Sequence, residues 1–138
     1  MTVTLTPDRP LERDPAIAVG NAPLQGKANR SSGWFLGAFV HAAEGLRHSE
    51  DVEVKWGTHA AGESKRGIGT NKTATTLALL ISGRFVVTFP GRGDVSLDQP
   101  GDYVVFGPDV PHGWTALADS VVITIRWPSL LGDQSVEG

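Results

Sequence analysis

The sequence predicts an all-β fold, either a sandwich or a barrel, built as one domain. From Trp34 onward, short apolar or alternating segments are separated by turn residues such as Gly, Pro and Asp. This succession of short strands and turns is typical of sandwiches and barrels. The length of 138 residues fits a single domain. A hydrophobic content of 40% is sufficient for an ordinary globular core.

Seven segments have the length and composition of strands. The tight turn Ser82-Gly83-Arg84 separates two of them and predicts a hairpin, because glycine supplies the dihedral angles that the turn needs. Between the first two strands, Ala42–His48 predicts a short helical turn. The predicted strands are Trp34–Val40, Val52–Gly57, Thr75–Ser82, Phe85–Pro90, Asp94–Leu97, Tyr103–Phe106 and Val121–Trp127.

Residues 1–33 differ in composition from the remainder of the chain. Four prolines lie there among charged and small residues, a pattern that disfavours helix interiors and central strands. We therefore expect an extended N-terminal arm over residues 1–33, followed by the β-barrel domain over residues 34–138. Two alternatives stay open: the arm lies over the domain or is strand-exchanged with a partner, or it is a partly disordered tail.

Composition excludes several classes of function. Twelve basic and fifteen acidic residues give a net charge of -3, and the basic residues are scattered, so we expect no nucleic-acid partner. Cysteine is absent, which excludes disulfides and thiolate ligands. No apolar segment is long enough to span a bilayer, and the N-terminal residues lack the apolar core of a secretory signal. We therefore expect no membrane association and a cytoplasmic location.

Two histidine motifs carry most of the chemical information in the sequence. The first runs from Gly57 to Glu63 and contains His59. The second opens with Pro-Gly-Asp at Pro100 and ends at His112. Two imidazoles and one carboxylate suit a first-row divalent metal with open coordination positions. His59, Glu63 and His112 are therefore the candidate metal ligands.

The two motifs and the segment around them, from about Trp34 to Ser129, resemble the cupin superfamily. The resemblance implies a single-domain, cupin-type jelly-roll β-barrel. It also implies a divalent transition metal held by the motif residues, with Fe, Mn, Ni, Zn and Cu all compatible with imidazole ligands. The first motif is degenerate, because Gly57 occupies the place of the first of two histidines. The alternative is a cupin whose histidines form hydrogen bonds in the pocket without a metal.

One further resemblance concerns the segment Arg126-Trp127-Pro128-Ser129. It is similar to the end of cupin-like sequences that are called signal peptidase I. Peptidase chemistry of that kind needs a membrane anchor and a serine with a lysine base, and the sequence singles out neither. We therefore do not expect a peptidase.

The alternation around His59 poses a conflict between charge and burial. In a regular strand, Glu53 and Lys55 share a face with His59, while the apolar Val54 and Trp56 share the other face. Either a bulge at Gly57 resets the alternation, or the barrel interior is polar here and the apolar face is covered by the arm or a second subunit. In the second case Lys55 and Glu53 line the pocket, where a buried lysine can take part in proton transfer. Tyr103, in the strand leading to His112, is the third candidate for proton transfer.

Three other residues are candidates for binding a ligand. Trp114 lies two residues after His112, and Trp56 lies in the strand that leads to His59. Aromatic walls of this kind commonly line pockets for small organic molecules. Arg126 lies within an apolar strand and suits the carboxylate of a ligand, with a structural ion pair as the alternative.

Three classes of function remain compatible with the sequence. The first is a metal-dependent cupin enzyme that acts on a small organic molecule by oxygenation, isomerisation, cyclisation or lyase chemistry. The second is a non-catalytic cupin that binds or senses a small molecule without a metal. The third is a structural protein whose barrel only assembles. In each case we expect a homodimer, because pairing would bury the apolar patch of Val52, Val54 and Trp56.

Overall fold

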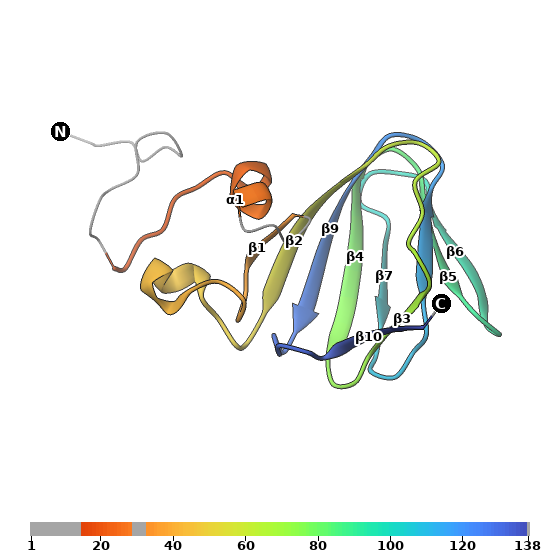
Figure 1. Ribbon diagram of the computed structural model, residues 1–138. Coiled ribbons are helices and arrows are strands. Elements are labelled where there is room, and N and C mark those ends of the chain that lie inside the picture. The colour runs from red at the N-terminus through yellow and green to blue at the C-terminus, as the bar shows by residue number, and fades with distance from the viewer. Residues whose placement is uncertain (1–14, 29–32, 138) are drawn as a thin grey trace.

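Two short helices and ten strands make up the part of the chain that the structure describes, residues 15–28 and 33–137 of a computed structural model (Figure 1). No helix in these ranges is both long and apolar enough to cross a membrane. The elements are α1 (Ala22–Ala28), β1 (Trp34–Leu36), a 3-10 helix (Ala42–Arg47), β2 (Glu53–His59), β3 (Ile68–Asn71), β4 (Thr75–Ser82), β5 (Phe85–Phe89), β6 (Gly93–Leu97), β7 (Tyr103–Phe106), β8 (Gly113–Ala116), β9 (Ser120–Trp127) and β10 (Gln134–Glu137).

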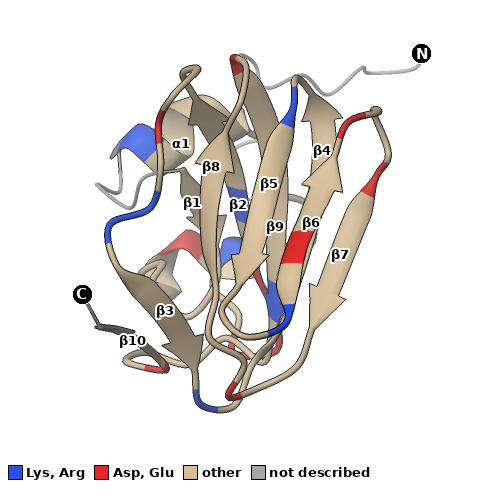
Figure 2. Ribbon diagram, turned by 90° about the vertical axis from the view of Figure 1, so that its right-hand side faces the viewer, with Lys and Arg blue, Asp and Glu red and all other residues tan. Residues whose placement is uncertain are grey.

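The strands form two layers, which Figure 2 shows with β5, β6 and β8 in front of β2 and β9. One layer is a five-stranded antiparallel sheet in the order β1-β2-β9-β4-β7. The other layer combines the sheet β6-β5-β8 with the pair β10-β3. Bridges from Ser64 to Thr115 and from Gly69 to His112 join these two parts. This arrangement confirms the predicted all-β class and its jelly-roll character.

The apolar core lies between the two layers. It arises because alternate residues of β4, β5 and β9 point inward, as the twofold period of a strand requires. Burial of these side chains is the main favourable contribution to folding. The buried core residues are Ala78, Leu80, Phe85, Val87, Phe89, Leu97, Ala116 and Val122.

The turn between β4 and β5 forms the predicted hairpin. Gly83 has a φ of 94°, and a Cβ atom there would overlap the Asp119 carbonyl oxygen. Both the dihedral angle and the close approach therefore require glycine at this position. The Pro-Gly-Asp motif is also a turn, in which Asp102 accepts hydrogen bonds from the backbone N–H groups of Asp98 and Gln99.

The strand predictions hold with shifts at their ends, but three strands were not predicted. β1 ends at Leu36, well before the predicted Val40, and β2 continues to His59. β3, β8 and β10 were missed because each is short and rich in glycine or polar residues, so no apolar alternation marks it. The predicted helical turn corresponds to the 3-10 helix Ala42–Arg47.

The expectation of an extended arm is wrong for Ala22–Ala28, which form α1. Asn21 starts this helix by accepting a hydrogen bond from the Leu24 N–H through its side-chain oxygen. Pro23 fits the first turn, where its missing N–H would have no helical partner. α1 lies beside β1 and β2 (Figure 1). Residues 1–14 and 29–32 of the predicted arm lie outside the described residues.

The alternation in β2 is unbroken. Its register with β9 runs without a shift from Glu53 opposite Arg126 to His59 opposite Ser120. A bulge at Gly57 is therefore excluded, and Lys55 points into the barrel together with His59. The polar-interior alternative is the one that the fold adopts.

Candidate functional site

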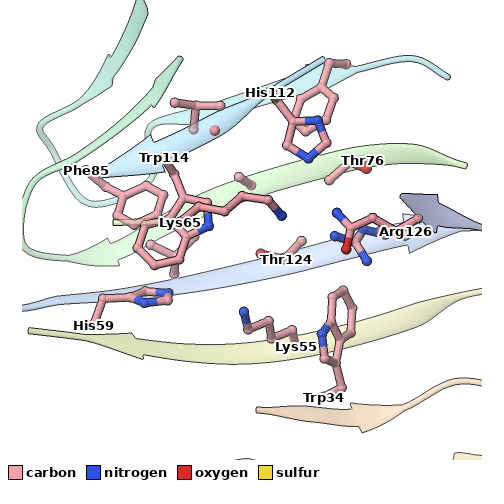
Figure 3. Close-up of a pocket in the computed structure, with 16 residues that line it drawn as sticks. Trp34, Lys55, His59, Lys65, Thr76, Phe85, His112, Trp114, Thr124 and Arg126 are labelled. Carbon is pink, nitrogen blue, oxygen red and sulfur yellow. The ribbon is translucent and has the colours of Figure 1, made fainter. Parts of the chain in front are cut away.

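A cavity of about 110 Å³ lies inside the barrel, and Figure 3 shows the side chains around it. We call it the central cavity. A single water molecule occupies about 30 Å³ of the liquid, so the cavity has room for a small organic molecule. Both layers contribute to the wall. Its side chains come from Trp34, Lys55, His59, Lys65, Thr76, Ala78, Phe85, Val87, Phe106, His112, Trp114, Val122, Thr124, Arg126 and Gln134.

One end of the central cavity is cationic. Lys55 of β2, Lys65 of the loop after β2 and Arg126 of β9 all line it, and Figure 3 shows the three side chains around one space. No aspartate or glutamate is among the described residues of the wall. Three basic groups facing a shared, partly desolvated space repel one another. This end is therefore suited to an anion.

Several buried polar atoms at the same end have no hydrogen-bond partner among the described residues. They are Thr76 Oγ1, Arg126 Nε and Gln134 Nε2, whose residues all line the cavity. Buried polar groups in folded proteins are nearly always paired, because leaving one unpaired costs about 1–3 kcal/mol. Arginine and amide N–H groups can only donate, and the threonine hydroxyl can donate as well. A ligand that accepts several hydrogen bonds would satisfy all three.

Arg126 is held in place by two neighbours. Its Nη1 donates to Glu53 Oε2 at 3.4 Å, and both side chains are 13% exposed. Glu53 also accepts a 2.7 Å hydrogen bond from the Ser129 hydroxyl. The guanidinium carbon lies 4.6 Å from the centre of the Trp34 ring, within the range of a cation–π contact. These contacts fix Arg126, while its Nε has no partner among the described residues.

Lys55 is the amine most affected by the pocket. Burial lowers the pKa of Lys55 to about 8, and the positive charges of Arg126 and Lys65 add to the effect. Lys55 forms no hydrogen bond or ion pair with the described residues. Its Nζ lies 5.9 Å from the centre of the Trp34 ring. At pH 7 about a tenth of this amine is therefore neutral, far more than for an ordinary lysine.

Lys65 reaches the pocket because of a glycine. A Cβ atom on Gly69 would lie 2.9 Å from Lys65 Nζ and 3.0 Å from Gln134 Nε2. The absence of a side chain at Gly69 thus lets the ammonium group lie beside the amide. Burial, followed by the charge of Arg126, lowers the pKa of Lys65 as well.

The opposite end of the central cavity is aromatic. The His59 and Trp114 rings are 4.3 Å apart, and Phe85 stacks on Trp114 at 5.2 Å. His59 Nδ1 donates to Glu63 Oε1 at 3.0 Å, while the other Glu63 oxygen accepts from the Ala60 N–H. Burial is the main cause that lowers the pKa of His59, and the Glu63 hydrogen bond opposes it. His59 is therefore a neutral imidazole at pH 7.

His112 lies on the other layer. Its Nδ1 lies 3.0 Å from the Val110 carbonyl oxygen, which can only accept, so Nδ1 carries the proton. The Phe106 ring packs on the imidazole at 4.5 Å. Burial lowers the pKa of His112, and the charges of Lys65 and Arg126 lower it further. Figure 3 shows the ring beside Thr76, away from His59.

The three predicted metal ligands do not assemble. Within residues 15–28 and 33–137, no three His, Asp or Glu side chains form a group that could hold a metal ion. The reason is local: Glu63 binds His59 Nδ1 at the rim, and His112 lies across the cavity. A Cβ atom on Gly57 would lie 2.8 Å from His59 Nε2, so this imidazole occupies the space of the missing first histidine. The donor set present therefore does not fit a resident metal.

The other predicted site residues are distributed unevenly. Trp114 and Arg126 line the central cavity, as does Lys55. Glu53 lies behind Arg126 rather than in the cavity wall. Tyr103 is 62% exposed, because Val104 and Phe106 take the inward positions of β7, and the expectation that it handles protons in the pocket is wrong.

A second, wider pocket of about 530 Å³ adjoins the central cavity; we call it the outer pocket. Lys55, His59, Lys65 and Trp114 line both spaces. Trp56 lines only the outer pocket, where Pro23 and Lys27 of α1 complete the wall together with Glu63 and Arg66. The outer pocket therefore lies next to the central cavity, on the side of α1.

Several wall residues were not predicted from the sequence. Trp34 and Gln134 lie on the short edge strands β1 and β10, and Lys65 lies in a loop. Thr76 and Thr124 interrupt the apolar alternation of β4 and β9, and each faces the same side of the sheet as Arg126. A threonine within an otherwise apolar strand is the sequence pattern that could have identified Thr76 and Thr124.

Comparisons with known proteins agree with the fold. No family model matches the chain, and no curated protein matches it. The structure of KdgF from Halomonas sp. is 25% identical, with a TM-score of 0.55, over 61% of this chain and 74% of that one. A cupin-like protein from Thermotoga maritima is 21% identical, with a TM-score of 0.56, over 64% and 66% of the two chains. A structure of the DMSP lyases RdDddP and RnDddQII is 23% identical, with a TM-score of 0.58, over 77% of this chain and 52% of that one.

These likenesses, together with the two-layered barrel, show that the chain has the cupin fold. The resemblance drawn from the histidine motifs is thus confirmed for the fold. Proteins similar to this chain in structure include enzymes, among them the DMSP lyases. A fold hosts many functions, so the function of this chain has to be argued from its own pocket.

Proposed function

We propose that this protein binds a small organic acid inside its barrel. The carboxylate would lie at the cationic end, where it would accept hydrogen bonds from Arg126 Nε, Gln134 and Thr76. The remainder of the molecule would pack against the aromatic end. The observation that carries the proposal concerns the described part of the wall: it has three basic side chains, no acidic one, and buried donors without a partner at one end.

Charge balance favours an anionic ligand over a neutral one. Of the three basic residues, Arg126 alone has a carboxylate partner in the described part of the chain, Glu53, and that partner lies behind the cavity. Lys55 and Lys65 face the cavity without an ion pair among the described residues. An anion would relieve their mutual repulsion in a space where charges interact more strongly than in water.

Metal-dependent chemistry has less support from this pocket. His59 and His112 face different parts of the wall, and Glu63 is engaged at the rim. We therefore favour the alternative that the sequence left open, a cupin that binds its small molecule through side chains. The groups that would hold the ligand are then the cationic ones rather than the histidine pair.

Calorimetric titration with matched pairs of small carboxylic acids and their neutral amides tests the proposal. We expect the acids to bind and the amides to bind at least about tenfold more weakly, since a charge-assisted hydrogen bond contributes about 1.5–3 kcal/mol. Lys65→Met should weaken acid binding by a similar factor. Lys72→Met, at an exposed residue outside both pockets, is the matched control and should leave the affinity unchanged.

Equal affinity for acids and amides would contradict the proposal. So would an acid affinity that Lys65→Met and Lys72→Met alter equally, because the effect would then come from net charge rather than from the cavity.

A further inference from the structure

We propose that Lys55 captures the carbonyl carbon of its bound ligand as an imine, so that the preferred ligands are oxo acids. This inference rests on the proposed binding of organic acids and names the subclass. The carboxylate would be held at Arg126, and the carbonyl group would face the Lys55 amine. The carboxylate alone would account for binding, whereas the imine adds a covalent and reversible step.

The position of Lys55 meets the first requirement of a nucleophile, which is a fixed approach. Lys55 lies in the middle of β2, opposite Trp34 of β1 and Thr124 of β9, so its backbone is held from both sides. Its side chain projects into the central cavity, which Arg126 also lines (Figure 3). It also lines the outer pocket, so its amine borders both spaces.

The second requirement is an amine with a free lone pair. The amine of Lys55 forms no hydrogen bond and no ion pair with any described residue. Burial and the neighbouring positive charges favour the neutral form of this amine. A lysine desolvated beside another cation is a known way to activate an amine for imine formation. Lys65 is the less suitable amine, because it lies in a loop with its Nζ beside Gln134.

The step balances without an oxidant or a further reactant. The lone pair of Lys55 Nζ attacks the carbonyl carbon, a C–N bond forms, and the oxygen takes up a proton that the nitrogen gives up. The resulting carbinolamine loses its hydroxyl group together with the remaining nitrogen proton as water. A C=N bond remains, and one water molecule leaves through the outer pocket. Hydrolysis by the reverse route releases the ligand.

Reductive trapping tests the inference, with pyruvate as the probe. The full chain is incubated with pyruvate at about pH 8 and reduced with borohydride, and the modified lysine is located by peptide mass spectrometry. The chain has four lysines, of which Lys72 is exposed and lies outside both pockets, so it serves as the internal standard. A lysine with a pKa of about 8 is roughly 100-fold more deprotonated at pH 8 than an ordinary one. We expect trapping at Lys55 to exceed that at Lys72 by a factor of this order.

Ligand and residue controls separate binding from capture. Acetone has the carbonyl but lacks the carboxylate, so it should be trapped weakly, and acetate should bind without being trapped. Lys55→Arg keeps the positive charge but lacks the amine, and it should abolish trapping. Lys72→Arg, at an exposed residue outside both pockets, is its matched control and should still be trapped at Lys55. The wild-type pattern alone tests the inference if a variant fails to fold.

The outcomes distinguish the two proposals. Trapping at Lys65, or equally at Lys55 and Lys72, overturns the imine. Calorimetric binding of pyruvate and acetate without any trapped product overturns the imine and leaves acid binding in place. If neither acid binds and no product is trapped, both proposals fail.

Discussion

The two faces of the five-stranded sheet depart in part from the usual distribution of polar and apolar residues. Antiparallel sheets normally place apolar residues inward and polar residues toward water. Here Lys55, Thr76, Thr124 and Arg126 point into the barrel from β2, β4 and β9. The outer face of the same strands is apolar. It carries Val54, Trp56, Leu77, Leu79, Ile123 and Ile125.

The two faces of the sheet therefore have different roles. The inner face gives up part of its core to a polar cavity, which costs stability unless a ligand or a partner group pairs with the charges. The outer face continues in β7, where Tyr103 is 62% and Val105 45% exposed. An apolar face of this extent marks an interaction site for another protein surface. We therefore predict that a second copy of the chain packs on it, as a homodimer.

The inner face should be most sensitive at Arg126. Arg126→Met leaves the Glu53 carboxylate buried without its partner, and we expect the free energy of unfolding to fall by about 3 kcal/mol. Urea unfolding measures the change. The double variant Glu53→Gln, Arg126→Met removes both charges and should recover part of the loss. A double variant as unstable as the single one would mean that Arg126 stabilises the fold by packing alone.

The outer face should respond to charge through assembly rather than folding. Ile123→Asp places a carboxylate in the centre of the predicted interface, so the dimer should dissociate about 100-fold more readily. Sedimentation over a range of protein concentrations measures this. Ser96→Asp is the matched control, because Ser96 is exposed on β6 in the other layer. A monomeric wild-type chain would refute the predicted dimer.

A third substitution, on the inner face, should stabilise the protein. Lys55→Met replaces a desolvated amine, whose pKa burial has lowered to about 8, with an apolar side chain of similar length. We expect the free energy of unfolding at pH 7 to rise by about 2 kcal/mol. Lys72→Met, on the surface, should change it by no more than about 0.5 kcal/mol. Equal effects of the two substitutions would show that burial of Lys55 does not lower the free energy of unfolding.

The twofold period of strands explains why much of this site could be predicted. Lys55, Trp114 and Arg126 lie at the cavity because alternation places every second residue of a strand on one face. The conflict between charge and burial in β2 was visible in the sequence, which left a bulge at Gly57 and a polar interior as two solutions. Whether a bulge or a polar cavity resolved the conflict depended on the pairing with β9, which alternation within one strand does not specify.

The remainder of the site depends on contacts between distant segments. Lys65 reaches the cavity because Gly69 makes room for it, and Gln134 arrives on a short strand near the end of the chain. Motif spacing placed His59 and His112 together as ligands. In the structure, however, His59 is hydrogen-bonded to Glu63, and its ring fills the space that the missing side chain of Gly57 leaves. Motif matching records neither effect, because each depends on side-chain packing.

The smallest effect that we predict is a loss of stability in weak acid. The pKa values of His59 and His112 are both lowered, mainly by burial, so the unfolded chain binds protons that the folded chain does not. The stability that the neutral imidazoles provide is then fully present above about pH 6.5 and is lost as the pH falls below it. The lowered pKa values of Glu63 and Asp133 act only in a more acidic range. Urea midpoints at about pH 7.5 and about pH 5.5 bracket the transition, and the double variant His59→Gln, His112→Gln should lose most of the difference. An unchanged difference in that variant would assign the acid sensitivity to groups outside the cavity.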